Sequence, residues 1–170
     1  MKNISFKFIL FHIIAAWFFI HAFATASLLF DVALVKGFIT EGESYFSTAN
    51  IGPRRISNFL VATGLSRFLG FIVSVCISFI ITRKHKVHWL NVLPLFIVGY
   101  FFLFYDFLGW NYLKFIFLLP GDASDIVSVK LTINSVVLLL LGMAVFRFAP
   151  IKDKTKDIYN DEKPGANATN

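Results

Sequence analysis

Long runs of apolar residues, interrupted by short polar segments, make up most of the chain. Four of these runs are long enough to cross a hydrocarbon core of about 30 Å as a helix, which takes roughly 20 residues. The pattern therefore predicts an all-α integral membrane protein, with a four-transmembrane-helix bundle formed by residues 1–150. Its spans are predicted at residues 8–30, 60–82, 89–107 and 131–148.

The segments between the spans are expected to be loops: residues 31–58, with a polar centre, the basic link RKHK at 83–86, and a turn around 120–122. Pro94 is expected to kink the third span, because proline removes a helical hydrogen bond. Residues 151–170 are polar and have too few apolar residues to form a core. They are predicted to be a disordered cytoplasmic tail.

Composition places the chain outside the range of soluble proteins. Hydrophobic residues make up 57% of it and charged residues 15%, against roughly 45–50% and 25% in soluble domains. The net charge is +6, but the basic residues are divided among short segments between the apolar runs. That distribution is typical of membrane topology signals and not of a phosphate-binding surface. We therefore expect membrane lipids as partners and no nucleic acid.

Most of the basic residues fall on one side of the membrane when the four spans are threaded through it. That side holds Lys2, Lys7, Arg83, Lys84, Lys86, Arg147, Lys152, Lys154, Lys156 and Lys163. Cytoplasmic loops carry an excess of Lys and Arg. Both termini are therefore predicted to be cytoplasmic, with the protein in the cell (cytoplasmic) membrane.

The N-terminus has a competing interpretation as a signal peptide. Residues 1–7 are basic, and Ala22-Phe23-Ala24 and Ala24-Thr25-Ala26 have the A-x-A form of a cleavage site. The apolar run nevertheless continues through Phe30, well past the roughly 7–15 residues of a signal-peptide core. We therefore favour a retained first helix. Cleavage would leave three helices in the same orientation.

Arg67 stands inside the second apolar run. With about 3.6 residues per turn, it shares one helical stripe with small and polar residues, Thr63, Gly70, Ser74 and Ser78. Small residues let transmembrane helices approach each other closely. Arg67 is therefore predicted to face protein and not lipid.

Counting from the cytoplasmic helix ends at about 1.5 Å per residue places four polar side chains at a similar depth. Arg67 lies about 22 Å above Thr82, and Asp106 about 25 Å above Trp89. His21 and Asn134, counted from the ends of their own helices, lie near about 20 Å. The count predicts an intramembrane polar layer, either structural or ligand-binding, of His21, Arg67, Asp106 and Asn134.

Three interpretations of this layer remain open. A charged side chain within a membrane segment costs at least about 2.5–3.5 kcal/mol, so Arg67 is expected to pair with Asp106. Such a pair could fix helix register only, Arg67 could instead extend to lipid phosphates, or the layer could line a functional cavity. Secondary candidates for binding an anion or a partner are predicted at the outer surface: Asp31, Arg54, Arg55 and Asp125.

Catalytic motifs are absent from the sequence. It contains no HExxH, no GxSxG, no P-loop and no dinucleotide-binding glycine pattern. His85 and His88 are spaced to share one helical turn, but no carboxylate or cysteine joins them, so contact with lipid headgroups is favoured over a metal. We predict no metal and no cofactor.

The leading hypothesis is a non-enzymatic membrane component that acts through protein–protein interaction, as an accessory, assembly or protective subunit. Its partner would be another membrane protein, bound through the helices or the outer loops. One alternative is a small transporter or lipid-handling protein that uses the outer-leaflet polar layer. The other is an intramembrane enzyme acting on a lipid-linked substrate, with Asp106 or His21 as the base and Arg67 holding phosphate.

Overall fold

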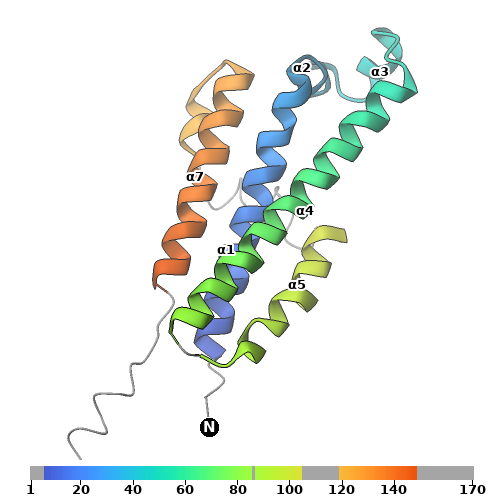
Figure 1. The fold of residues 1–170 in the computed structure, drawn as a ribbon. Helices are drawn as coiled ribbons and strands as arrows, with labels where there is room; N and C mark the ends of the chain where they lie inside the picture. The colour runs from blue at the N-terminus through green and yellow to red at the C-terminus, as the bar shows by residue number, and fades with distance from the viewer. Residues whose placement is uncertain (1–5, 86, 105–118, 149–170) are drawn as a thin grey trace, which may run out of the picture.

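The computed structural model describes residues 6–85, 87–104 and 119–148, and this part of the chain is almost entirely helical, with no strands (Figure 1). The α-helices are α1 (Phe6–Ser27), α2 (Val32–Glu41), α3 (Ser44–Thr48), α4 (Pro53–Lys84), α5 (Leu93–Phe104) and α7 (Val127–Phe148). Three short 3₁₀ helices lie between them, η1 (Leu28–Asp31), η2 (Trp89–Asn91) and η3 (Pro120–Ala123).

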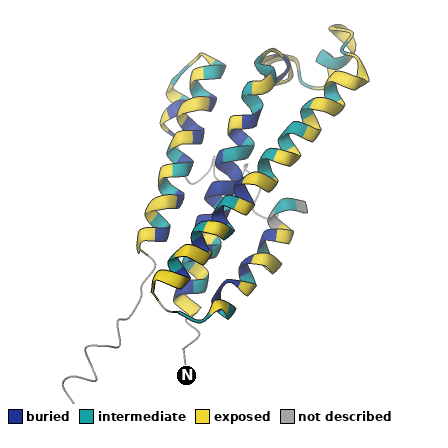
Figure 2. Ribbon diagram, in the orientation of Figure 1, coloured by how far each residue is buried: buried dark blue, intermediate teal, exposed yellow. Residues whose placement is uncertain are grey.

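Helix α1 is the centre of the bundle, because it packs against α4, α5 and α7. Its middle is the most continuously buried part of the molecule, whereas the other long helices are exposed on their outer sides (Figure 2). Residues of α1 take part in three apolar clusters. Ala16 and Ile20 contact Phe71 and the α5 region, and the other clusters centre on Phe18 with Leu138 and on Phe19 with Phe146.

Glycines allow two close approaches to α1. At Gly70 of α4, an added Cβ would lie 2.7 Å from the Phe19 carbonyl oxygen and 3.1 Å from the Ile20 Cα, so the two backbones are almost in contact. At Gly142 of α7, an added Cβ would lie 2.8 Å from the Phe19 ring. Small residues at helix crossings allow this kind of packing in membrane bundles, where burial of apolar surface contributes little between helices.

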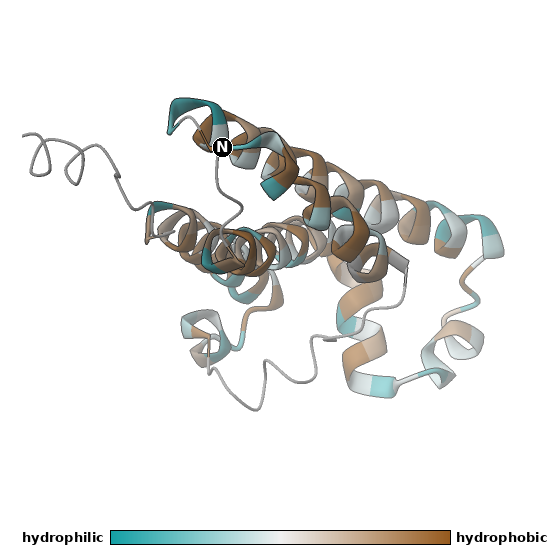
Figure 3. Ribbon diagram, turned by 90° about the horizontal axis from the view of Figure 1, so that it is seen from below, coloured by the Kyte–Doolittle hydropathy of each residue, from teal (hydrophilic) through white to brown (hydrophobic). Residues whose placement is uncertain are grey.

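Three helical segments are long and apolar enough to cross a membrane: Phe6–Glu41, Pro53–Lys84 and Val127–Phe148. Many large apolar side chains on their outer sides are exposed, including Leu65, Ile80 and Leu140 at 60% or more. Viewed from below, hydrophobic residues cover most of the long helices, and hydrophilic residues gather mainly at their ends (Figure 3). An apolar surface of this extent is unusual for a soluble monomer and suits contact with lipid.

The predicted third span differs from the structure where the two can be compared. The span 89–107 was expected to be one kinked helix, but it is divided into η2 and α5, and Pro94 lies in the first turn of α5. Proline is tolerated there because the first N–H groups of a helix have no intrahelical acceptor. Helix α5 has 12 described residues, about 18 Å, and residues 105–107 lie outside the described part. The fourth crossing therefore remains a prediction.

The predicted loop at residues 31–58 is mostly helical, which corrects the sequence analysis. Asp31 caps α2, because its carboxylate accepts a hydrogen bond of 3.0 Å from the Leu34 backbone N–H. Helix α2 ends at Gly42, whose φ of +66° is favourable only for glycine. Pro53 then begins α4, seven residues earlier than the predicted span. The polar centre at residues 40–44 misled the prediction because most of it is helical: it covers the end of α2 and the start of α3, and only residues 42 and 43 form a turn.

The start of α1 and the end of α7 lie at the same end of the bundle (Figure 1). This agrees with an even number of crossings between them. The side of the membrane that this end occupies stays a prediction. The tail at 151–170 lies outside the described residues.

Replacing Gly70 by alanine is expected to lower the free energy of unfolding by about 1–3 kcal/mol, because the new methyl group meets the backbone of α1, which cannot move aside cheaply. Unfolding by sodium dodecyl sulfate in mixed micelles, followed by helix content, measures the effect. The matched control is Gly64→Ala in the same helix, where an added Cβ meets nothing within 4 Å. Equal losses in the two variants would contradict the close crossing.

Candidate functional site

Three members of the predicted polar layer lie in the described residues, one on each of three helices. His21 of α1 is 6% exposed and Asn134 of α7 is 2% exposed, whereas Arg67 of α4 is half-buried. The His21 ring packs edge-on against Trp17, with 4.6 Å between the ring centres. His21 and Arg67 both have interaction partners. Asp106 lies outside the described residues, so its pairing with Arg67 stays a prediction.

The stripe predicted around Arg67 is largely the buried face of α4. Gly70, Ser74 and Ser78 are buried against the bundle, and Cys76, on the opposite side, is exposed. Ser74 Oγ donates a hydrogen bond of 2.7 Å to the Phe71 carbonyl oxygen of its own helix. The buried positions all lie in the second half of α4, however, and no residue from 53 to 69 is buried.

Asn134 uses both ends of its amide to hold the η3 turn against α7. Its Oδ1 accepts a hydrogen bond of 2.9 Å from the Gly121 backbone N–H, and its Nδ2 donates one of 3.2 Å to Asp122 Oδ1. Lys130 Nζ forms an ion pair of 2.9 Å with the same Asp122 oxygen. Gly121 is required because an added Cβ would collide with the Asn134 side chain. These contacts give Asn134 a structural role within its own part of the fold.

The Asp122 carboxylate is stabilised in its charged form. Partial burial raises the pKa of Asp122, but the hydrogen bonds from Lys130 and Asn134 and the charge of Lys130 lower it more, so the net pKa lies below its ordinary value. The turn between residues 119 and 123 is therefore held by an ionic and an amide contact together.

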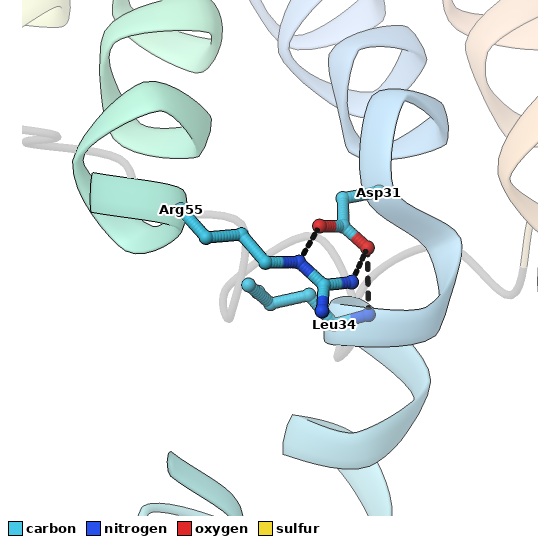
Figure 4. A network of polar contacts seen from close by, with 3 residues as sticks. All are labelled: Asp31, Leu34 and Arg55. Atoms are coloured by element: carbon cyan, nitrogen blue, oxygen red, sulfur yellow. Dashed lines mark hydrogen bonds and ion pairs between the residues drawn. The ribbon is translucent and has the colours of Figure 1, made fainter. Parts of the chain in front are cut away.

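Two of the secondary residues form a clamp between α4 and the start of α2 (Figure 4). Arg55 Nε donates to Asp31 Oδ2 at 2.6 Å, and Arg55 Nη2 donates to Asp31 Oδ1 at 2.7 Å. Asp31 Oδ1 also accepts the capping bond from Leu34, so one carboxylate serves both helices. Bidentate pairing of this kind fixes orientation as well as distance. Arg54 and Asp125 are exposed.

A buried polar contact that the sequence analysis did not identify joins α1 and α4. His12 is 1% exposed, Ser78 is fully buried, and His12 Nδ1 lies 2.5 Å from Ser78 Oγ. The His12 ring packs between Phe8 and Phe146, with ring centres 3.9 and 5.0 Å away. His12 Nε2 is buried without a hydrogen-bond partner. One serine therefore provides the hydrogen bond of a histidine enclosed by three helices.

Side chains that could hold a metal ion were compared across the described residues. No group of three or more His, Cys, Asp or Glu side chains able to hold a metal ion occurs within residues 6–85, 87–104 and 119–148. The polar groups brought together there are engaged in helix contacts. Comparisons with protein-family models, curated protein sequences and solved structures found no match for this chain.

Ser78→Ala is expected to lower the free energy of unfolding by about 1–3 kcal/mol, because it leaves a buried histidine without its hydrogen bond. Detergent unfolding of the purified chain measures the loss. Ser74→Ala is the matched control, since Ser74 is equally buried but bonds only to its own helix. If Ser74→Ala destabilised the chain as much, the His12 contact would carry no special weight.

Acid is expected to weaken the attachment of η3 to α7. Because the folded pKa of Asp122 is lowered, its contribution is complete above the ordinary pKa near 3.9 and is lost as the pH falls through the lowered value. The free energy of unfolding should therefore fall more steeply with acid in the wild type than in Asp122→Asn. Asp125→Asn removes an exposed carboxylate of the same connection and should keep the wild-type acid dependence. Identical curves for the wild type and Asp122→Asn would exclude this role.

Proposed function

We propose that this chain is a non-enzymatic, multi-pass component of the cell membrane that binds a transmembrane helix of another protein. Both termini and the RKHK link are proposed to be cytoplasmic. The observation that carries the proposal is the exposure of the first half of α4, where no residue from 53 to 69 is buried, although this half is as helical as the rest.

The exposed half of α4 carries a regular apolar face. Val61, Gly64, Leu65 and Phe68 follow the spacing of one helix side, and the three larger residues are 57%, 60% and 49% exposed. Gly64 lies between them, and an added Cβ there would meet nothing within 4 Å. A small residue flanked by larger apolar ones is the usual contact surface between membrane helices, because it lets a second backbone approach. Lipid alone requires no such glycine.

This half of α4 is held in position at both ends. The Arg55–Asp31 clamp fixes the start of this half to the beginning of α2. At the other end of this half, the close crossing at Gly70 fixes α4 to α1. This half of α4 is therefore already ordered in the free chain. Binding a partner would cost it little conformational entropy, which favours binding. Helix α4 also has 32 residues, about 48 Å, and is inclined to α1 and α7 (Figure 1). Its upper part therefore leans away from α7, with α2 between the two helices (Figure 1).

The proposal is tested with a photo-activated crosslinking residue at position 68 of the full chain in its native membranes. A discrete adduct with one protein other than this chain is expected. The control places the same residue at Met143 of α7, which is 58% exposed on an apolar face with Val136 and Leu140. That face has Leu139 where the α4 face has Gly64, so no second backbone can approach it closely and no discrete adduct is expected. Gly64→Leu should lower the yield at position 68 without lowering the free energy of unfolding, because the new side chain enters open space and leucine favours a helix more than glycine does.

The clamp provides an independent check of the same surface. Asp31→Arg and Arg55→Asp each place like charges together and should reduce the adduct at position 68. The double exchange should restore part of it, because the ion pair returns but α2 still lacks the carboxylate that caps it. Adducts with lipid alone at both positions would contradict a protein partner. An adduct of twice the chain's own mass would show self-association instead.

A further inference from the structure

The second half of α4 has another apolar surface, on the side away from the α1 contact. It forms one wall of a groove of about 450 Å³ whose other wall is η2 and the start of α5. The lining side chains are Val75, Cys76, Phe79, Ile80, Trp89, Val92, Leu93 and Phe96. Every one is apolar or aromatic except the thiol of Cys76, and only Val92 is buried below one tenth. The volume falls within the range of about 300–1,000 Å³ that small-molecule sites occupy.

An aromatic contact between α4 and α5 lies at one end of the groove. Phe71 of α4 contacts Phe96 edge-on, with 6.0 Å between ring centres, and the Phe71 ring occupies the space beside Gly99. The groove therefore extends from the bundle interior toward the helix ends at Lys84 and Trp89.

Basic residues follow the groove at the end near Lys84 and Trp89. Cys76, Phe79 and Ile80 lie on one side of α4, and spacings of three and four residues lead from Phe79 and Ile80 to Arg83 and Lys84. Both cations lie in the last turn of α4 and are exposed, as is His85. Trp89 is 59% exposed beside them, and tryptophan is enriched at the depth of lipid headgroups.

We propose that this groove binds one anionic glycerophospholipid, with an acyl chain along the groove and its phosphate between Arg83 and Lys84. An acyl chain matches a lining with no charged residue, and the two cations supply the attraction that a neutral lipid would not satisfy. A basic cluster at a helix end that meets the membrane surface attracts anionic lipid by about 1 kcal/mol per Lys or Arg. This site is separate from the exposed face at Val61 to Phe68.

The probe is quenching of Trp89 fluorescence by brominated phosphatidylglycerol or brominated phosphatidylcholine in vesicles of the two lipids. Trp17→Phe and Trp110→Phe leave Trp89 as the sole tryptophan of three. Preferential association of phosphatidylglycerol is expected. Arg83→Gln with Lys84→Gln should lower that preference at least about fivefold, since about 1 kcal/mol corresponds to that factor.

Two variants distinguish this site from general surface charge. Arg147→Gln removes the exposed last-turn arginine of α7 at the same end of the bundle and should leave the preference unchanged. Cys76→Phe fills the groove and should reduce quenching by both lipids. Equal effects of Arg147→Gln and the double substitution, unchanged quenching in Cys76→Phe, or quenching that falls as protein density rises would each overturn the proposal. The last result would indicate that a second copy covers the groove.

A second measurement leaves the three tryptophans in place, so it does not depend on the folding of the single-tryptophan variant. Native mass spectrometry of the wild type, after exchange into equal amounts of the two unmodified lipids, should show retained phosphatidylglycerol in excess. Loss of that excess in Arg83→Gln/Lys84→Gln, but not in Arg147→Gln, is expected. Equal retention of both lipids by the wild type would overturn the proposal.

Discussion

The near-contact of the α1 and α4 backbones at Gly70 is the constraint on which the rest of the arrangement depends. It fixes where α4 can touch the bundle, and because the two helices are inclined to each other, contact is lost on one side of the crossing. Toward the helix ends at Lys84, the buried residues Ser74, Ser78 and Thr82 follow α1. Toward Pro53, no residue of the helix is buried, and its described polar contact with the bundle is the Arg55–Asp31 clamp. One glycine therefore divides α4 into a packed half and an exposed half.

The two described ion pairs orient connecting segments and contribute little to holding the helices together. Asp31 with Arg55 and Asp122 with Lys130 lie in or beside connecting segments, at the end of the bundle opposite the start of α1 and the end of α7. Partly exposed pairs of this kind contribute little free energy, about 1 kcal/mol or less. Their effect is geometric, because each fixes a connection on a long helix. The apolar clusters and the close helix crossings hold the helices together.

Hydrophobic run length predicted the helical class and the three helices that are long and apolar enough to cross a membrane, because crossing a bilayer imposes a minimum of apolar residues. Helical spacing also identified the buried Gly70, Ser74 and Ser78 side of α4. It did not find the Asp31–Arg55 clamp, since the pairing depends on how α2 turns after α1. Nor did it find His12 with Ser78. Counting from Phe8 and Thr82 places both about 6 Å from their helix ends, so depth could have paired them, but the face of α1 that meets α4 is set by packing.

The burial of His12 has a consequence for how the chain is made. Its hydrogen-bond partner lies 66 residues later, and Phe146, which covers its ring, belongs to the last described helix. A chain that enters the membrane from its N-terminus therefore inserts its central helix before any of the helices that surround it. Until α4 arrives, the imidazole of α1 lies among lipid or against the insertion machinery with its polar atoms unsatisfied. During synthesis, the central helix therefore stays without its buried contacts until the helices that provide them, α4 and α7, have been made.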